Sequence, residues 1–177
     1  MGQLVMRWYR EKHPALPDKP DWGEFVCRAY DGSPEDVARW NDIICDSFGD
    51  GTDPGDETTL ELTMNMHGKY EADKFLIVEK DGEGVATLAV IPHWDKSEGY
   101  IHMVGCRTKY QGLGVGTKMN AEAVRILFAC GFRTAYLTTD DHRIPAIKSY
   151  LRAGFEPEMT DPDHPERWEK IFAEIGE

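Results

Sequence analysis

A glycine-rich turn, Gln111–Gly116, has the composition of a phosphate-binding site. It stands between a strand-like run, Tyr100–Cys106, and a long helical pattern that begins directly after Gly116. Glycines lack Cβ atoms, so their backbone can approach an anion closely. The free N–H groups at a helix start then point at the anion, and the helix dipole favours negative charge there. We therefore expect a ligand that carries phosphate at this turn.

Three nucleotide-binding patterns compete for the turn. The P-loop pattern needs lysine followed by Ser or Thr, whereas here the lysine follows the threonine. The dinucleotide fingerprint G-x-G-x-x-G also fails, because Gly112, Gly114 and Gly116 are spaced two apart. The third pattern, Q/R-x-x-G-x-G/A, is filled by Gln111, Gly114 and Gly116. An ordinary glycine-rich loop is the alternative, and the surrounding elements decide between the two.

Composition argues against several classes of function. The chain has 177 residues, which suits one domain with a sizeable core. A net charge of −12 argues against a nucleic-acid partner, since phosphate backbones are bound by clustered Lys and Arg. The cysteines form no C-x-x-C pair and the carboxylates of 46–57 lack EF-hand spacing, so we predict no metal site. We find neither a signal peptide nor an apolar run of ~20 residues, which predicts a cytoplasmic protein without membrane attachment.

Hydrophobic periodicity predicts the elements that position the turn. We expect strands at residues 25–30, 75–79, 85–91, 100–106 and 134–139, and helices after Pro34, at 58–66, after Gly116, at 143–153 and at 164–175. Residues 4–10 form either a short strand or an arm, and three prolines between His13 and Asp21 predict an extended linker. The strand at 134–139 should run parallel to the strand at 100–106, because the helix between them makes a right-handed crossover.

A second motif, Arg143–Phe155, follows the parallel strand. It resembles N-x-x-A-I-x-x-Y-x-x-x-G-F, which is matched by Ala146, Ile147, Tyr150, Gly154 and Phe155. Together with the turn at 111–116, it makes the chain similar to the GNAT superfamily of N-acetyltransferases from roughly Phe25 to Phe155. Arg143 stands where that family usually has asparagine, so the role of the asparagine is not carried over. The amphipathic tail and Met6-Arg7-Trp8 resemble the branch of the family that includes mycothiol synthase.

The resemblance implies an α+β fold of three layers. Its sheet would be mixed and mostly antiparallel, with a central parallel strand pair splayed at the CoA site and helices on both faces. We expect residues 1–22 to form an N-terminal arm and linker, and residues 23–177 to form a single acetyltransferase domain. Acetyl-CoA is the implied co-substrate. The implied binding residues are Val104 and Cys106 on the strand edge and Gln111, Gly112, Leu113, Gly114, Val115, Gly116 and Thr117 in the turn.

The resemblance also implies two catalytic side chains. Tyr150 matches the acid that protonates the leaving thiolate, because a phenol with a pKa of ~10 can supply a proton to a thiol of ~8.5. Strand alternation predicts that Tyr100, His102, Val104 and Cys106 share a face. Tyr100 occupies the position where some members carry a glutamate base, so His102 becomes the candidate base. A packed tyrosine, a structural histidine and a water relay are the alternatives.

The expected activity is transfer of an acetyl group to a primary amine of a small molecule by direct attack on the thioester. A backbone N–H near Val104 would stabilise the thioester oxygen. A non-catalytic acyl-CoA sensor and an acetyltransferase for protein or peptide amines are the alternatives, and a homodimer is left open. The carboxylates expected to bind a cationic acceptor are Asp53, Asp56, Glu57 and Glu61.

Overall fold

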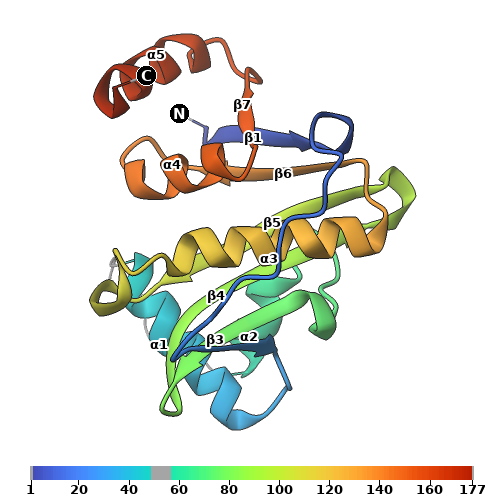
Figure 1. The fold of residues 1–177 in the computed structure, drawn as a ribbon, viewed down its shortest axis with the longest axis vertical. Coiled ribbons are helices and arrows are strands. Elements are labelled where there is room, and N and C mark those ends of the chain that lie inside the picture. Colours follow the sequence, from blue (N-terminus) through green and yellow to red (C-terminus); the bar gives the residue numbers. More distant parts are fainter. Residues whose placement is uncertain (1, 49–56, 177) are drawn as a thin grey trace.

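The computed structural model describes residues 2–48 and 57–176. A seven-stranded sheet has the order β2-β3-β4-β5-β6-β1-β7, with helices on both faces (Figure 1). The strands are β1 (Leu4–Tyr9), β2 (Val26–Ala29), β3 (Phe75–Lys80), β4 (Glu83–His93), β5 (Glu98–Cys106), β6 (Thr134–Thr139) and β7 (Glu156–Glu158). The helices are α1 (Pro34–Phe48), α2 (Glu57–Met64), α3 (Val115–Cys130), α4 (Ile144–Arg152) and α5 (His164–Ile175). The expected α+β fold is confirmed.

One pair of neighbouring strands, β5 and β6, is parallel, and the pairing is short. Its register covers only Glu98–Tyr100 against Thr134–Tyr136, although both strands continue beyond it. The other paired strands are antiparallel. The two parallel strands therefore splay after Tyr100, as predicted, and no strand of the described residues pairs with the β6-facing edge of β5 from Ile101 onward.

The N-terminal segment is a strand rather than an arm. Strand β1 lies between β6 and β7 and pairs antiparallel with both, so it completes the sheet from the opposite end of the chain. Leu4, Met6 and Trp8 alternate into the core and are fully buried. We expected residues 1–22 to be an arm and linker beside a domain at 23–177. Strand β1 lies within residues 1–22, yet it is part of the sheet of that domain.

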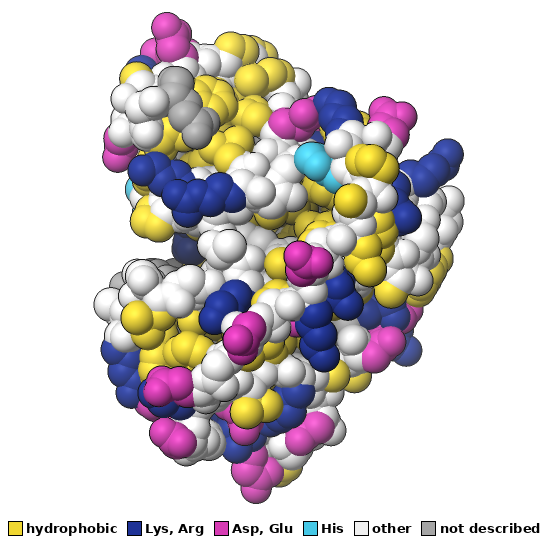
Figure 2. Space-filling view, viewed as in Figure 1, with side chains coloured by type: hydrophobic (Ala, Val, Ile, Leu, Met, Phe, Trp, Pro, Cys, Tyr) yellow, Lys and Arg dark blue, Asp and Glu magenta, His cyan; other side chains and the backbone are white. Residues whose placement is uncertain are grey.

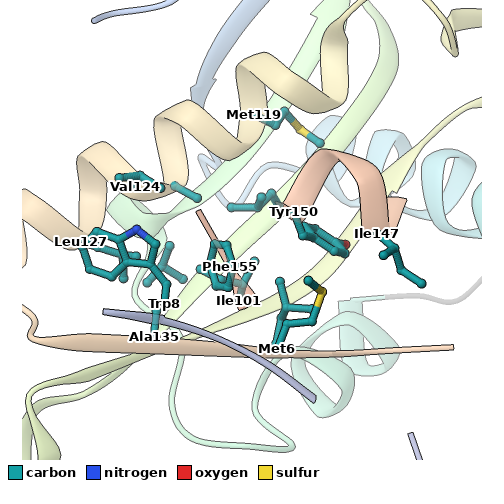
Figure 3. Close-up of a cluster of buried hydrophobic side chains, with 14 of the residues drawn as sticks. Met6, Trp8, Ile101, Met119, Val124, Leu127, Ala135, Ile147, Tyr150 and Phe155 are labelled. Atoms are coloured by element: carbon teal, nitrogen blue, oxygen red, sulfur yellow. The ribbon is translucent and has the colours of Figure 1, made fainter. Parts of the chain in front are cut away.

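Two hydrophobic cores lie on opposite faces of the sheet. The larger one packs residues of α3, α4 and α5 against β1, β4, β5 and β6. Figure 3 shows Tyr150 pointing into it from α4, near Met6 and Phe155. The smaller one packs α1 and α2 against β3, β4 and β5. None of the described helices is long and apolar enough to cross a bilayer.

Helix α1 begins where the sequence predicted it. Pro34 occupies the first turn, and the backbone N–H of Asp36 donates to Ser33 Oγ at 3.1 Å. The Asp36 side chain is fully buried and accepts hydrogen bonds from Arg28 and Arg39. Burial raises the pKa of this carboxyl, but the hydrogen bonds from the two arginines and from the Asp31 backbone outweigh it and hold the pKa well below its ordinary value.

A bulge in β5 corrects the prediction that Tyr100, His102, Val104 and Cys106 share a face. The register with β4 shifts between Thr87 and Ala89, and Met103 has φ +50°. Tyr100 therefore packs in the core beneath α1 and α2, whereas Val104 and Cys106 pack in the core beneath α3. One extra residue reverses the alternation of side chains, so the prediction from strand periodicity was wrong beyond His102.

Candidate acetyl-CoA site

The glycine turn leads into α3 with its backbone exposed. Gly112 and Gly114 both have φ +79°, a left-handed conformation that side chains disfavour. Gly114 is the N-cap of α3 and offers no side chain to its N–H groups. The first helical hydrogen bond joins the N–H of Lys118 to the Gly114 carbonyl, so the amides of residues 115–117 precede the helical ladder. This is the donor array that an anionic phosphate group needs.

The segment before the turn is anchored to the β3–β4 hairpin. Glu83 accepts hydrogen bonds from Arg107, Lys109 and Tyr110 at 2.6–2.7 Å. From the other side, the Gln111 side chain donates to the Cys106 carbonyl at 3.2 Å. These bonds fix the approach to the turn, which places the glycine backbone at a defined position beside β5.

A cleft of about 480 Å³ lies between this turn, the splayed end of β5 and helix α4. Figure 2 shows the surface hollowed between α4 and the start of α3. The cleft collects most of the predicted residues, namely Val104, Cys106, Gln111, Gly112, Gly114, Val115, Gly116, Thr117 and Tyr150. Two predicted residues are not among its lining: Leu113, whose side chain is largely exposed, and His102. Five of the six residues of the glycine turn and a tyrosine 34 positions after it thus line one hollow.

Tyr150 lines the cleft from α4, and its ring is buried in the larger core. Burial raises the pKa of its phenol to about 12, opposed by the charge of Arg143. The phenol therefore carries its proton throughout the neutral range, as a proton donor must. Sequence reasoning missed a neighbouring link, in which Asn120 of α3 donates to Ser149 Oγ of α4 at 2.7 Å. That bond joins the two helices that border the cleft.

Cys106 lines the same cleft, and its environment is that of an inert thiol. Burial, together with the nearby charge of Asp46, raises its pKa to about 11. A thiol needs the thiolate form to act as a nucleophile, so covalent catalysis by this cysteine is disfavoured. The side chain forms part of the cleft wall, and the predicted backbone role of Cys106 at the strand edge stays a prediction.

His102 lies on the opposite face of β5. Its Nε2 is 2.9 Å from the Thr63 carbonyl at the end of α2, so this nitrogen carries the donated proton. Burial lowers the pKa of its imidazole, and the neighbouring charge of His67 lowers it further. Tyr100 stacks on the His102 ring with 5.2 Å between centroids. The lone pair of a neutral His102 is therefore on Nδ1.

His67 is a residue that the sequence did not point to. Its ring lies edge-on to Tyr100 at 4.9 Å and to His102 at 5.5 Å, and its side chain is exposed. It follows α2, far from β5 in the sequence, and no spacing rule links the two. Of the carboxylates expected to bind an acceptor, Asp53 and Asp56 lie outside the described residues, as does the side chain of Glu57. Glu61 accepts hydrogen bonds from Tyr70 and Asn65.

Comparison with known proteins agrees with this geometry. The acetyltransferase (GNAT) family matches residues 37–155, which is more than half of the chain. A mycothiol acetyltransferase of Streptomyces bingchenggensis is 30% identical over 128 residues, covering 72% of this chain and 42% of the relative. One from Streptomyces avermitilis is 28% identical over 149 residues, covering 84% and 46%. The chain thus spans less than half the length of these curated relatives.

Solved structures show the same fold. A GCN5-related N-acetyltransferase from Sphaerobacter thermophilus superposes with a TM-score of 0.70 at 21% sequence identity. The match covers 88% of this chain and 48% of that chain. The matched family segment contains β5, the glycine turn, α3 and α4, which line the cleft. The chain belongs to the acetyltransferase (GNAT) family.

Proposed function

We propose that the protein is an acetyl-CoA-dependent N-acetyltransferase that acts on a primary amine of a small molecule. The observation that carries the proposal is the cleft itself, which brings the glycine turn, the open edge of β5 and Tyr150 together. Acetyl-CoA supplies the activated acetyl thioester. The protein's contribution is to bind it, to orient it and to handle two protons.

Binding would rest mainly on backbone groups. The amides of 112–117 would receive the pyrophosphate, which the dipole of α3 also favours. The unpaired edge of β5 from Ile101 onward would pair with the pantetheine amides as an added strand does. At the bulge, Met103 and Val104 have no paired partner in β4, which supports the expected backbone donor to the thioester oxygen.

Proton transfer would use the two sides of β5. On the cleft side, Tyr150 would donate its proton to the leaving sulfur. On the other side, Nδ1 of His102 would accept a proton from the amine while Nε2 keeps its bond to Thr63. A lowered pKa keeps His102 neutral near pH 7, the state in which a base must be.

A small-molecule acceptor is supported by the relatives named mycothiol acetyltransferase. The aromatic surface of Tyr100, His67 and His102 would meet it on the α2 side. The net charge of −12 favours approach of a cationic amine. A cytoplasmic location and a homodimer are further predictions about this protein.

An amine-panel assay tests the proposal. Release of the CoA thiol from acetyl-CoA is followed with small amines, amino sugars, amino acids and lysine peptides in parallel. We expect amine-dependent release for a small amine that exceeds hydrolysis without amine. Tight binding of acetyl-CoA without turnover on any amine would favour the sensor alternative, and turnover on peptides alone would favour protein acetylation.

A further inference from the structure

Arg143 is the position at which the second motif departs from its family pattern. The residue caps α4 at the end of the β6–α4 link, and it lines the cleft. Its guanidinium lies 4.4 Å from the centre of the Phe48 ring, and its Nε lies 3.5 Å from Asp140 Oδ2. The side chain is thus held over an aromatic face at the end of α1, with one partly exposed carboxylate on its Nε side.

The cleft has an unusual charge for this protein. Among the described residues, its lining contains two arginines, Arg143 and Arg152, and no carboxylate, although the chain has a net charge of −12. The other titratable groups of the lining are Cys106, Tyr110 and Tyr150, and the pKa of each is raised. Of the carboxylates nearby, Asp46 accepts the Thr108 amide and Asp140 faces Arg143. At neutral pH the cleft wall is therefore cationic.

Arg143 is the arginine whose charge acts at the reacting end of the cleft. It is the N-cap of α4, and it lines the same cleft as Tyr150 of that helix. Its positive charge opposes the rise of the Tyr150 pKa. Arg152 lies at the end of α4 with an exposed side chain.

Tyr150 alone is a poor acid for a thiolate in this environment. Its phenol has a pKa of about 12, whereas a thiol has an ordinary pKa of ~8.5. Proton transfer to the sulfur is therefore uphill, and negative charge must stay on the sulfur as the carbon–sulfur bond breaks. A fixed cation in the cleft would stabilise that charge.

We propose that Arg143 is a further catalytic residue, which stabilises the leaving thiolate of CoA electrostatically from the start of α4. As the amine nitrogen forms its bond to the acetyl carbon, the carbon–sulfur bond breaks and its electron pair goes to the sulfur. The amine proton passes to His102, and the sulfur, after it has gained the electron pair, takes its proton from Tyr150. The role rests on the proposed function, because it needs the CoA sulfur to lie beside Tyr150.

The test measures the thiol of bound CoA rather than turnover alone. Ultraviolet absorbance of the thiolate is titrated with pH for CoA bound to wild type, Arg143→Met, Arg143→Gln and Arg143→Lys. Arg152→Met serves as the matched control, because it removes the other cleft arginine. In parallel, the affinity of CoA is compared with that of desulfo-CoA, which lacks the sulfur.

We expect the wild type to lower the pKa of the bound thiol by about one unit, as a nearby cation does. Both neutral variants should restore the thiol to its free value and reduce kcat about 10-fold, with a smaller change in KM for acetyl-CoA. Arg143→Lys should retain most of the effect, and Arg152→Met should retain all of the thiol shift. Well above pH 8.5 the preference of the wild type for CoA over desulfo-CoA should approach 10-fold, and the neutral variants should show no such preference.

If the bound CoA thiol has the same pKa in the wild type and in both neutral variants, the role of Arg143 is overturned and the proposed function stays intact. Failure of the folded wild type to bind either CoA or desulfo-CoA would instead overturn the proposed function, and the role of Arg143 with it. Circular dichroism of each variant tests whether the variant is folded. Arg143→Met and Arg143→Gln differ in shape, so a result seen in both does not come from local misfolding of one of them.

Discussion

The two sides of β5 are built in different ways. The α3 side offers an apolar wall, two left-handed glycines and uncapped helix amides, so its binding groups are largely backbone. The α2 side offers His102 stacked on Tyr100, with His67 edge-on to both, so the groups proposed to act there are side chains. A backbone site recognises what all acyl-CoA molecules share, whereas a side-chain site can change with the acceptor. The difference explains why the co-substrate is easier to infer than the acceptor.

The largest predicted effect comes from removing the proposed proton donor on the α3 side. Tyr150→Phe deletes one hydroxyl from a buried ring, so we expect kcat to fall about 1,000-fold with little change in acetyl-CoA affinity. Steady-state kinetics and calorimetric binding measure the two quantities. Tyr9→Phe, at the far end of β1, is the control and should match wild type. Unchanged kcat in the Tyr150 variant would show that solvent protonates the sulfur.

The α2 side is tested next, through its candidate base. His102→Gln keeps an amide donor for the Thr63 carbonyl but removes the titrating nitrogen, so kcat/KM should fall about 100-fold. The lowered pKa of His102 predicts that wild-type activity persists as the pH falls through ~6.5 and declines below it. That acidic decline should vanish in the variant. An identical pH profile in both proteins would favour a water relay.

The buried carboxylate of Asp36 in α1 has a structural role, so its replacement should lower stability rather than activity. Asp36→Asn leaves Arg28 and Arg39 without their shared buried carboxylate, so the free energy of unfolding should fall by about 2 kcal/mol. The pKa of Asp36 is lowered on folding, so its stabilisation is present above the unfolded value of ~3.9 and is lost as the pH falls further. Urea denaturation measures this loss at neutral pH, with exposed Glu35→Gln as control. A reduced kcat without lost stability would contradict a purely structural role.

The smallest predicted effect is a difference in acetyl-CoA affinity between variants at two glycines of the turn. Gly114→Ala places a side chain at φ +79°, which costs about 1 kcal/mol and should weaken acetyl-CoA binding about 5-fold. Gly116→Ala is the matched control, because its φ is not left-handed and its added Cβ would meet Ser149 Oγ at an ordinary 3.7 Å. Equal affinities for the two variants would show that turn conformation does not limit binding.

The sequence predicted the backbone side of this comparison better than the side-chain side. The turn, the helix after it and the parallel pairing of β5 with β6 follow local rules of glycine chemistry and periodicity, and the fold confirms them. The bulge at Met103 could not be foreseen, because methionine at φ +50° carries no sequence signal. The place of β1 between β6 and β7 and the contact of His67 with His102 depend on long-range packing, which local patterns do not encode.

Isothermal titration of acetyl-CoA into the wild type, Gly114→Ala and Gly116→Ala tests the central claim most directly. The site predicts one saturable binding event per chain, weakened in Gly114→Ala and nearly unchanged in Gly116→Ala. Absence of binding to the folded wild type at millimolar acetyl-CoA would contradict the claim that this cleft holds the acetyl donor.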